Sequence, residues 1–280
     1  MIMPKGWKPS NDKVKERGYN NEQRINDNYW IKRSTTLLSL KRYEEAIECC
    51  DKALEKEPNN EYAWHNKAQC LYKLEKFEEA IEYIDKILAI SHNKSTLLLS
   101  KAQCLYGLKR YDEAIKYYNK VLELTPWDAF ALMQKAISFA NLEKYEECIE
   151  CCDKAIEINP NEVWAWDLKG SALLNLKKNI ESVKSYEKAL EIIQDIASIW
   201  HHKGVALNFL EKYYEAIECC DKAIEIDPND SGGFSCKALS FYGLHRYSEC
   251  LDYCNKAIEI DPNALEALKL KHICLKAMGV

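Results

Sequence analysis

The chain has 280 residues, a formal net charge of −5, and 30% Asp, Glu, Lys and Arg. An acidic chain lacks the basic footprint of a nucleic-acid binder, so nucleic acid is the less favoured partner. No apolar run is long enough to cross a membrane, and residues 1–9 lack the apolar segment of a secretory signal. We therefore expect a cytoplasmic protein with no membrane partner.

Residues 1–26 form a polar segment that fits no repeat. Two prolines and two glycines stand among six basic and three acidic side chains. A segment of this composition buries too little apolar surface to offset the entropy lost on ordering. We expect it to be disordered.

From about residue 27 the sequence has a period of 34 residues with no insertion or deletion. Five prolines stand at the same position of the period, namely Pro58, Pro126, Pro160, Pro228 and Pro262. Proline removes a backbone donor and restricts the residue before it, so each one ends a helix. Small residues recur at positions 8 and 20, where two antiparallel helices come closest. The period predicts helical hairpins that stack on one another around a continuous core.

The letters of the period resemble the tetratricopeptide repeat (TPR). Trp30, Trp64, Trp166 and Trp200 take position 4, and position 11 is Leu or Phe in every copy. The resemblance implies an all-α fold, a right-handed superhelical solenoid of TPR helical hairpins, with seven repeats over residues 27–264. Residues 265–280 supply a first helix with no second, and three lysines make them a polar C-terminal capping helix.

The helical period assigns each repeat position to a face. Positions 18, 19, 22, 25, 26 and 29 of the second helix form a convex set, with 27 acidic residues against nine lysines. Positions 2, 5, 6, 9, 12 and 13 of the first helix form a concave set, by resemblance the lining of the groove. Only Lys32, Lys73 and Asp167 carry fixed charge in the concave set. A face that is merely solvated is expected to be charged, so the concave set is the candidate binding surface.

Aromatic and amide side chains of the concave set, which supply contact area and hydrogen bonds for a peptide, define the predicted partner-binding residues. They are Tyr62, His65, Asn66, Gln69, Tyr72, Gln103, Tyr106, Phe130, Met133, Gln134, Trp164, Asp167, Asn175, His201, His202, Asn208 and Phe209. The alternative occupants of this stripe are the protein's own tail and a second copy of the chain.

A basic residue at position 7 of every repeat departs from the leucine of the family. The series is Arg33, Lys67, Lys101, Lys135, Lys169, Lys203, Lys237 and Lys271. The favoured interpretation is that the stems pack between helices while the charged ends reach neighbouring carboxylates. The alternative is an anion-binding edge for an acidic or phosphorylated partner.

The thirteen cysteines are expected to be small core residues. An odd count with three adjacent pairs is a poor disulfide framework. Cys148 and Cys152, or Cys250 and Cys254, lie one helical turn apart as two metal ligands would, but three repeats separate these pairs. We expect neither a metal nor a cofactor.

Two activities known for other proteins are disfavoured by the residues present. The carboxylate clamp of chaperone-binding relatives needs Lys at position 5 and Asn at position 9, and here only Asn66, at position 6, matches its role. No phosphate loop, nucleophile elbow or metalloprotease motif occurs, so we expect no enzyme activity.

The sequence therefore predicts a scaffold that binds a protein or peptide partner in its groove. A structural spacer or self-associating homo-oligomer is the alternative, and RNA binding is the third hypothesis.

Overall fold

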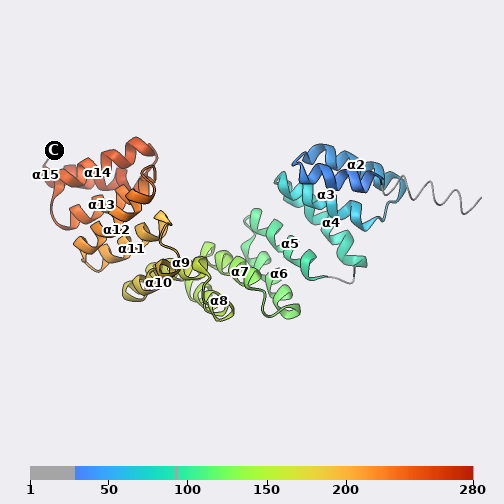
Figure 1. The fold of residues 1–280 in the computed structure, drawn as a ribbon, viewed down its shortest axis with the longest axis horizontal. Helices are drawn as coiled ribbons and strands as arrows, with labels where there is room; N and C mark the ends of the chain where they lie inside the picture. The colour runs from blue at the N-terminus through green and yellow to red at the C-terminus, as the bar shows by residue number, and fades with distance from the viewer. Residues whose placement is uncertain (1–28, 92–93, 280) are drawn as a thin grey trace, which may run out of the picture. The chain divides into compact units, whose positions relative to one another are not determined.

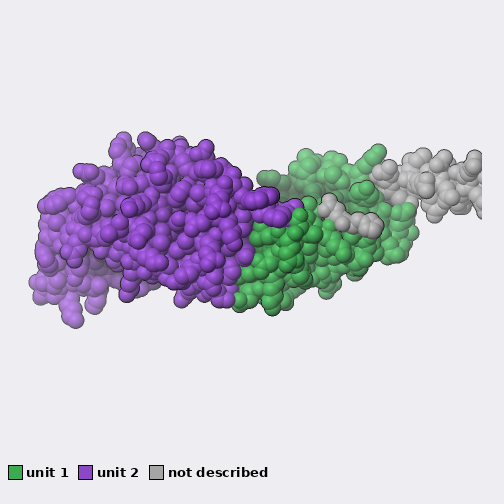
Figure 2. Space-filling model, turned by 90° about the horizontal axis from the view of Figure 1, so that it is seen from below, with its two compact units in different colours: residues 1–124 green, residues 125–280 purple. Residues whose placement is uncertain are grey.

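The computed structural model describes residues 29–91 and 94–279, and within these ranges it is helical with no strand (Figure 1). The predicted all-α fold of successive helical hairpins is thus confirmed. The chain divides into two compact units, residues 1–124 and 125–280 (Figure 2). The predicted disordered segment lies outside the described residues.

Unit 1 begins with a helix whose described residues are 29–39. Five further helices follow: α2 (Tyr43–Lys56), α3 (Glu61–Lys73), α4 (Phe77–Ile90), α5 (Ser95–Gly107) and α6 (Tyr111–Leu124). First helices of 13 residues alternate with second helices of 14 from α3 onward, as the 34-residue period requires.

Unit 2 continues the same alternation. Its helices are α7 (Ala129–Asn141), α8 (Tyr145–Ile158), α9 (Val163–Asn175), α10 (Asn179–Ile192), α11 (Ala197–Phe209), α12 (Tyr213–Ile226), α13 (Ser231–Gly243), α14 (Tyr247–Ile260) and α15 (Leu265–Met278). Within each unit, the two helices of a hairpin pack together, and each hairpin packs on the next.

The two small positions of the repeat face each other inside a hairpin, as predicted. Position 20 is fully buried in every copy, whether Ala, Cys or Ser. In the hairpin of α9 and α10, Ser182 at this position donates a hydrogen bond to the carbonyl of Gly170 at position 8, at 2.8 Å. A Cβ added to Gly170 would lie 2.7 Å from the ring of Tyr186. Larger residues at these positions would separate the two helices.

In each of the seven repeats, the first helix is followed by a residue whose backbone is in the left-handed conformation. Lys41, Glu75, Lys109, Glu143, Lys177, Glu211 and His245 all have φ between 58° and 60°. The amide of the next residue then bonds back five residues, as Lys144 does to Phe139 at 3.0 Å. This Schellman arrangement satisfies carbonyls at the helix end and turns the chain into the second helix.

Proline is not required where the second helix ends. The helix α10 stops at Ile192 although Gln194 takes the proline position, just as α8 stops at Ile158 before Pro160. At both ends the C-cap residue leaves the helical region, since Ile193 and Asn159 are extended. Proline is therefore compatible with this end but does not create it.

Eleven of the thirteen cysteines are free and buried, which agrees with the expected core role. Cys220 and Cys236 instead form a disulfide between α12 and α13, which the sequence pattern did not predict. The two sulfurs lie beside Gly204, whose absent Cβ would stand within 2.9 Å of both of them. The close approach thus depends on a glycine at position 8 of the sixth repeat.

Candidate functional site

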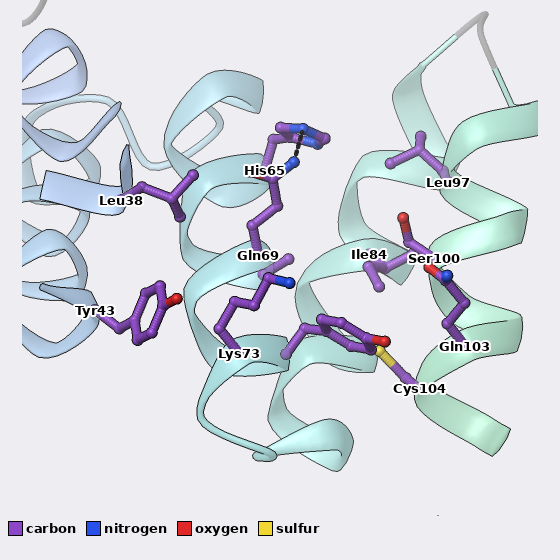
Figure 3. A pocket seen from close by; sticks show the side chains of 12 residues that line it. Leu38, Tyr43, His65, Gln69, Lys73, Ile84, Leu97, Ser100, Gln103 and Cys104 are labelled. Carbon is purple, nitrogen blue, oxygen red and sulfur yellow. Dashed lines mark hydrogen bonds between the residues drawn. The ribbon is translucent and has the colours of Figure 1, made fainter. Parts of the chain in front are cut away.

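A cavity of about 280 Å³, here called the unit 1 pocket, opens between helix 29–39, α3 and α5 (Figure 3). Leu38 and Tyr43 stand on one side, and the α5 residues Leu97 and Gln103 stand on the other. Seven of its twelve lining residues belong to the concave set, namely Leu38, His65, Gln69, Tyr72, Lys73, Ser100 and Gln103. The cavity thus brings together seven side chains that the helical period assigns to one face.

The inner wall of the unit 1 pocket is apolar and its rim is polar. Ile84 and Leu97 are buried, and they lie with Ala68 and Cys104 in one hydrophobic cluster. Ala68, Ile84, Leu97 and Cys104 belong to the lining but not to the concave set. Ala68, Leu97 and Cys104 occupy first-helix positions next to the concave set, and Ile84 lies on the second helix α4. A projection of one helix face leaves out all four.

His65 and Gln69 form the hydrogen bond drawn in the rim of the pocket, with Nε2 to Nε2 at 2.9 Å. Burial lowers the pKa of His65, so its ring is uncharged at neutral pH. An uncharged ring accepts the proton of the Gln69 amide, because an amide nitrogen is only a donor. The His65 contact uses the Gln69 nitrogen and leaves the amide oxygen as the acceptor of that side chain.

Two predicted tyrosines stack on the helix that follows them. The ring of Tyr72 packs edge-on against Phe77, with centroids 5.6 Å apart, and Tyr106 packs against Tyr111 at 5.3 Å. Burial, followed by the nearby Cys104 thiol, raises the pKa of Tyr72. Both rings are half-buried and thus fixed in orientation, whereas Tyr62 is 71% exposed.

Asn66 differs from the other predicted residues of unit 1. Its side chain is buried, and Nδ2 donates to the hydroxyls of Ser34 at 2.8 Å and Thr35 at 2.9 Å. The amide thereby links α3 to helix 29–39. This contact between neighbouring repeats is a sufficient reason for the asparagine, which the face assignment alone did not reveal.

The predicted residues of α7 are unequally exposed. Phe130 is 48% exposed, Gln134 is half-buried, and Met133 is 8% exposed. On the following first helices, Trp164 and Phe209 are the exposed aromatic residues, at 54% and 61%. The concave set of unit 2 therefore presents the exposed aromatic side chains of Phe130, Trp164 and Phe209.

Asp167 and His202 are brought together by α9 and α11, with Oδ1 3.1 Å from Nδ1. A carboxylate only accepts, so Nδ1 of His202 is the donor. The His201 ring lies beside that of His202, with ring centroids 4.8 Å apart and the ring planes tilted by 45°. The predicted amide of Asn175 is engaged within its own helix, because it donates to the Ser171 carbonyl at 2.9 Å.

Asn208 is buried between α11 and α13. Its Nδ2 donates to the Cys236 carbonyl at 3.2 Å, while no partner for its Oδ1 occurs among the described residues. As with Asn66, the amide nitrogen joins consecutive repeats. The repeat position alone therefore does not distinguish residues that link repeats from residues that are exposed for binding.

Within residues 29–91 and 94–279, no cluster of His, Cys, Asp or Glu has the arrangement of a metal site. Over the same ranges, no helix has the length and apolar character of a membrane span.

These features define an α-helical repeat protein whose first helices carry aromatic and amide side chains at the positions of the concave set. Two models of the tetratricopeptide repeat match the chain, one at residues 129–162 and 197–230 and the other at residues 165–196. The model of anaphase-promoting complex, cyclosome, subunit 3 matches residues 39–121. The chain belongs to the tetratricopeptide repeat family.

Solved structures of tetratricopeptide repeat proteins share the fold. A protein from Parabacteroides merdae is 16% identical, with 90% of this chain and 99% of that chain covered and a TM-score of 0.70. The C-terminal part of a repeat protein from Cytophaga hutchinsonii is 19% identical, with 86% and 98% covered and a TM-score of 0.70. YrrB, described as a TPR protein with an unusual peptide-binding site, is 20% identical, with 69% and 99% covered and a TM-score of 0.55. No curated protein gave a significant match.

Proposed function

We propose that this protein is a non-enzymatic scaffold whose unit 1 pocket receives an apolar side chain of a partner peptide. The observation that carries the proposal is the pocket itself, an apolar recess rimmed by amides on the concave set. The cytoplasmic location expected from the sequence forms part of the same proposal.

The size of the pocket favours a side chain over a cofactor. Sites for drug-sized ligands enclose roughly 300–1,000 Å³, and this cavity encloses about 280 Å³. Its lining holds one fixed charge, Lys73, and no carboxylate. An aliphatic or aromatic side chain fits such a recess, because burying it against Ile84 and Leu97 removes apolar surface from water.

The rim supplies the hydrogen bonds that fix a peptide backbone. Gln69 and Gln103 present amides on α3 and α5, on opposite sides of the recess (Figure 3). Each amide both donates and accepts, which matches the alternating N–H and C=O groups of a peptide. The relative YrrB carries a peptide-binding site according to its description, which supports the same use of the fold.

Selection of peptides tests the proposal directly. A displayed library of random 12-residue peptides is selected on the intact chain, and the affinity of the enriched peptides is measured by fluorescence anisotropy. We expect a recurring apolar residue, and we expect Tyr72→Ala with Tyr106→Ala to abolish binding. Gln103→Trp, which fills the pocket from its rim, is expected to act in the same way without removing a core side chain.

The matched control is Tyr214→Ala, which removes a 68% exposed tyrosine from the convex set. Circular dichroism verifies that all variants remain folded. Equal binding by wild type and the pocket-filling variant would show that the peptides bind elsewhere and would refute the proposed site.

A further inference from the structure

Unit 2 holds an acidic side chain that is separate from the unit 1 pocket. In its concave set only Asp167 has a fixed charge. The Asp167 side chain is 16% exposed, and its Oδ1 is held by Nδ1 of His202. A carboxylate that is mostly removed from water is stabilised best by a full positive charge nearby.

The lysines closest to Asp167 in the repeat are engaged elsewhere. Lys169 bonds Asp153 at 2.5 Å and lies over the ring of Trp166. Lys203 bonds Glu187 at 3.0 Å. Both ammonium groups therefore neutralise carboxylates of the convex set, and neither lysine bonds Asp167, which accepts a hydrogen bond from His202.

His201 adds no positive charge to this region at neutral pH. Its ring lies against the start of α13, where a Cβ on Gly232 would stand 2.8 Å from it. Burial lowers the pKa of His201 to about 4, with a further contribution from His202, while Asp230 and Asp167 act in the opposite direction. Two carboxylates, on α9 and at the N-cap of α13, thus act on an uncharged imidazole.

Trp164 is the second, independent feature of the site. It stands three residues before Asp167 on α9, so the two side chains share one face of the helix. The indole is 54% exposed, although an aromatic ring of this size is usually buried. An exposed indole beside a carboxylate is the combination that binds an organic cation, through the face of the ring and through charge.

We propose that Trp164 and Asp167 form a subsite for the guanidinium group of an arginine in a partner peptide. Guanidinium is planar and more weakly hydrated than ammonium, so it stacks on indole while donating to a carboxylate. Asp167 keeps Oδ2 for this bond, because His202 occupies Oδ1. The subsite does not depend on the unit 1 pocket.

The test uses the full chain with the unit 1 pocket filled by Gln103→Trp. Random 12-residue peptides are selected on this variant, and the enriched peptides are resynthesised with citrulline, the uncharged analogue of arginine, at each arginine. We expect a recurring arginine whose replacement by citrulline weakens binding at least about tenfold, the range of a charge-assisted hydrogen bond.

The same peptides are measured on Asp167→Asn, which keeps an acceptor for His202, and on Glu191→Gln as a control. Glu191 belongs to an exposed pair on α10, so this change removes one charge from the same unit outside the subsite. The citrulline effect is expected to fall below about twofold on Asp167→Asn and to persist on Glu191→Gln. Trp164→Ala is expected to weaken the arginine peptide without altering the fold.

Three results would overturn the proposal. They are recovery of no binder, enrichment of peptides without arginine, and an equal citrulline effect on wild-type Asp167 and Asp167→Asn. Equal affinity for lysine and arginine at the recurring position would overturn the assignment to guanidinium.

Discussion

The ammonium of Lys101 on α5 bonds both carboxylate oxygens of Asp85 on α4, at 2.5 and 2.7 Å. It also lies 4.8 Å from the ring centre of Tyr117 on α6. Burial opposes the charge of Lys101, but the hydrogen bonds that its ammonium makes with Asp85 and Tyr117 outweigh burial and raise the pKa of Lys101. Position 7 of one repeat is therefore paired with position 25 of the repeat before it.

The same pairing recurs along both units and explains the basic residue at position 7. Lys67 pairs with Asp51, Lys169 with Asp153, Lys203 with Glu187, Lys237 with Asp221, and Lys271 with Asn255. The interpretation of buried stems whose charged ends reach carboxylates is confirmed for the lysines that face Asp or Glu, whereas Lys271 reaches the amide oxygen of Asn255. They connect neighbouring repeats, which is where an array of this kind derives its cooperativity.

We expect Lys101→Met to lower the free energy of unfolding by about 1 kcal/mol, because the apolar stem is kept while Asp85 loses its partner. Solvent screening limits the effect, since Asp85 is 49% exposed. The measurement is urea unfolding followed by circular dichroism.

Lys120→Met is the control for that change. Lys120 also lies over the Tyr117 ring, at 4.5 Å, but it belongs to the convex set and not to position 7. Its substitution is expected to change the free energy of unfolding by less than about 0.5 kcal/mol. A double-mutant cycle with Asp85→Asn that yields no coupling energy would rule out the proposed link between repeats.

The left-handed turn residues yield a stabilising substitution. Glu143 has φ 58°, a conformation that costs a residue with a Cβ about 1–2 kcal/mol. Glu143→Gly is expected to raise the free energy of unfolding by about 0.5–1 kcal/mol, after subtraction of the entropy that glycine loses on folding.

Glu146→Gly, three residues later, is the control, because it places glycine inside a helix where a destabilising effect is expected. Glu146 lies in the first turn of α8, so glycine there is expected to destabilise by about 1 kcal/mol. Thermal unfolding measured for both variants checks the contrast. Destabilisation of equal size by both substitutions would show that the left-handed backbone carries no strain that glycine relieves.

Much of the fold followed from the period, because hairpin geometry depends on small and apolar residues at fixed positions. The residues that link repeats did not follow from it. Asn66 and Asn208 occupy concave positions, but their amide nitrogens donate hydrogen bonds to the first helix of a neighbouring repeat. Whether such a bond forms depends on which residue stands opposite on that helix. The period also continues without interruption from Leu124 to Thr125, where the chain divides into two units.

The unit 1 pocket was predictable only in part, for a related reason. A helical projection places His65, Gln69, Tyr72 and Gln103 on one face, and the cavity includes all four. Its depth, however, depends on how far Ile84 and Cys104 recede behind that face. The depth of the cavity is set by packing between helices, so it cannot be read from the sequence of one helix.

Buried thiols make unit 1 sensitive to alkali. Burial raises the pKa of Cys50 and Cys104 to about 12 and that of Cys70 to about 11. The unfolded chain releases these protons near pH 9, before the folded chain does, so the stabilisation present below pH 9 is lost as the pH rises. We expect the free energy of unfolding to fall by about 2 kcal/mol per thiol between pH 8 and 10.5.

Urea titrations at the two pH values check this expectation for wild type and for Cys70→Ala with Cys104→Ala. Alanine is a natural residue at this repeat position, as in Ala172 and Ala206, so the double variant should stay folded. Its loss of stability between pH 8 and 10.5 is expected to be smaller than that of wild type. An identical loss in both proteins would assign the alkaline sensitivity to lysine and tyrosine alone.

His201 makes unit 2 sensitive to acid. Burial lowers its pKa to about 4, so the unfolded chain binds a proton below about pH 6.5 that the folded chain does not accept until the pH is lower. The stabilisation by the uncharged ring is therefore complete above pH 6.5 and is lost as the pH falls. By pH 5 the loss amounts to about 2 kcal/mol.

His201→Gln removes the titrating group, and it is expected to flatten the dependence of unit 2 stability on pH between 7 and 5. Hydrogen exchange measured on α11 and α13 follows unit 2 separately from unit 1. The control is His272→Gln on the exposed side of α15, which is expected to leave the dependence unchanged. Because carboxylates also titrate in this interval, the difference between the variants is the decisive quantity. If His201→Gln and His272→Gln follow the same pH profile as wild type, then His201 is not held uncharged against α13.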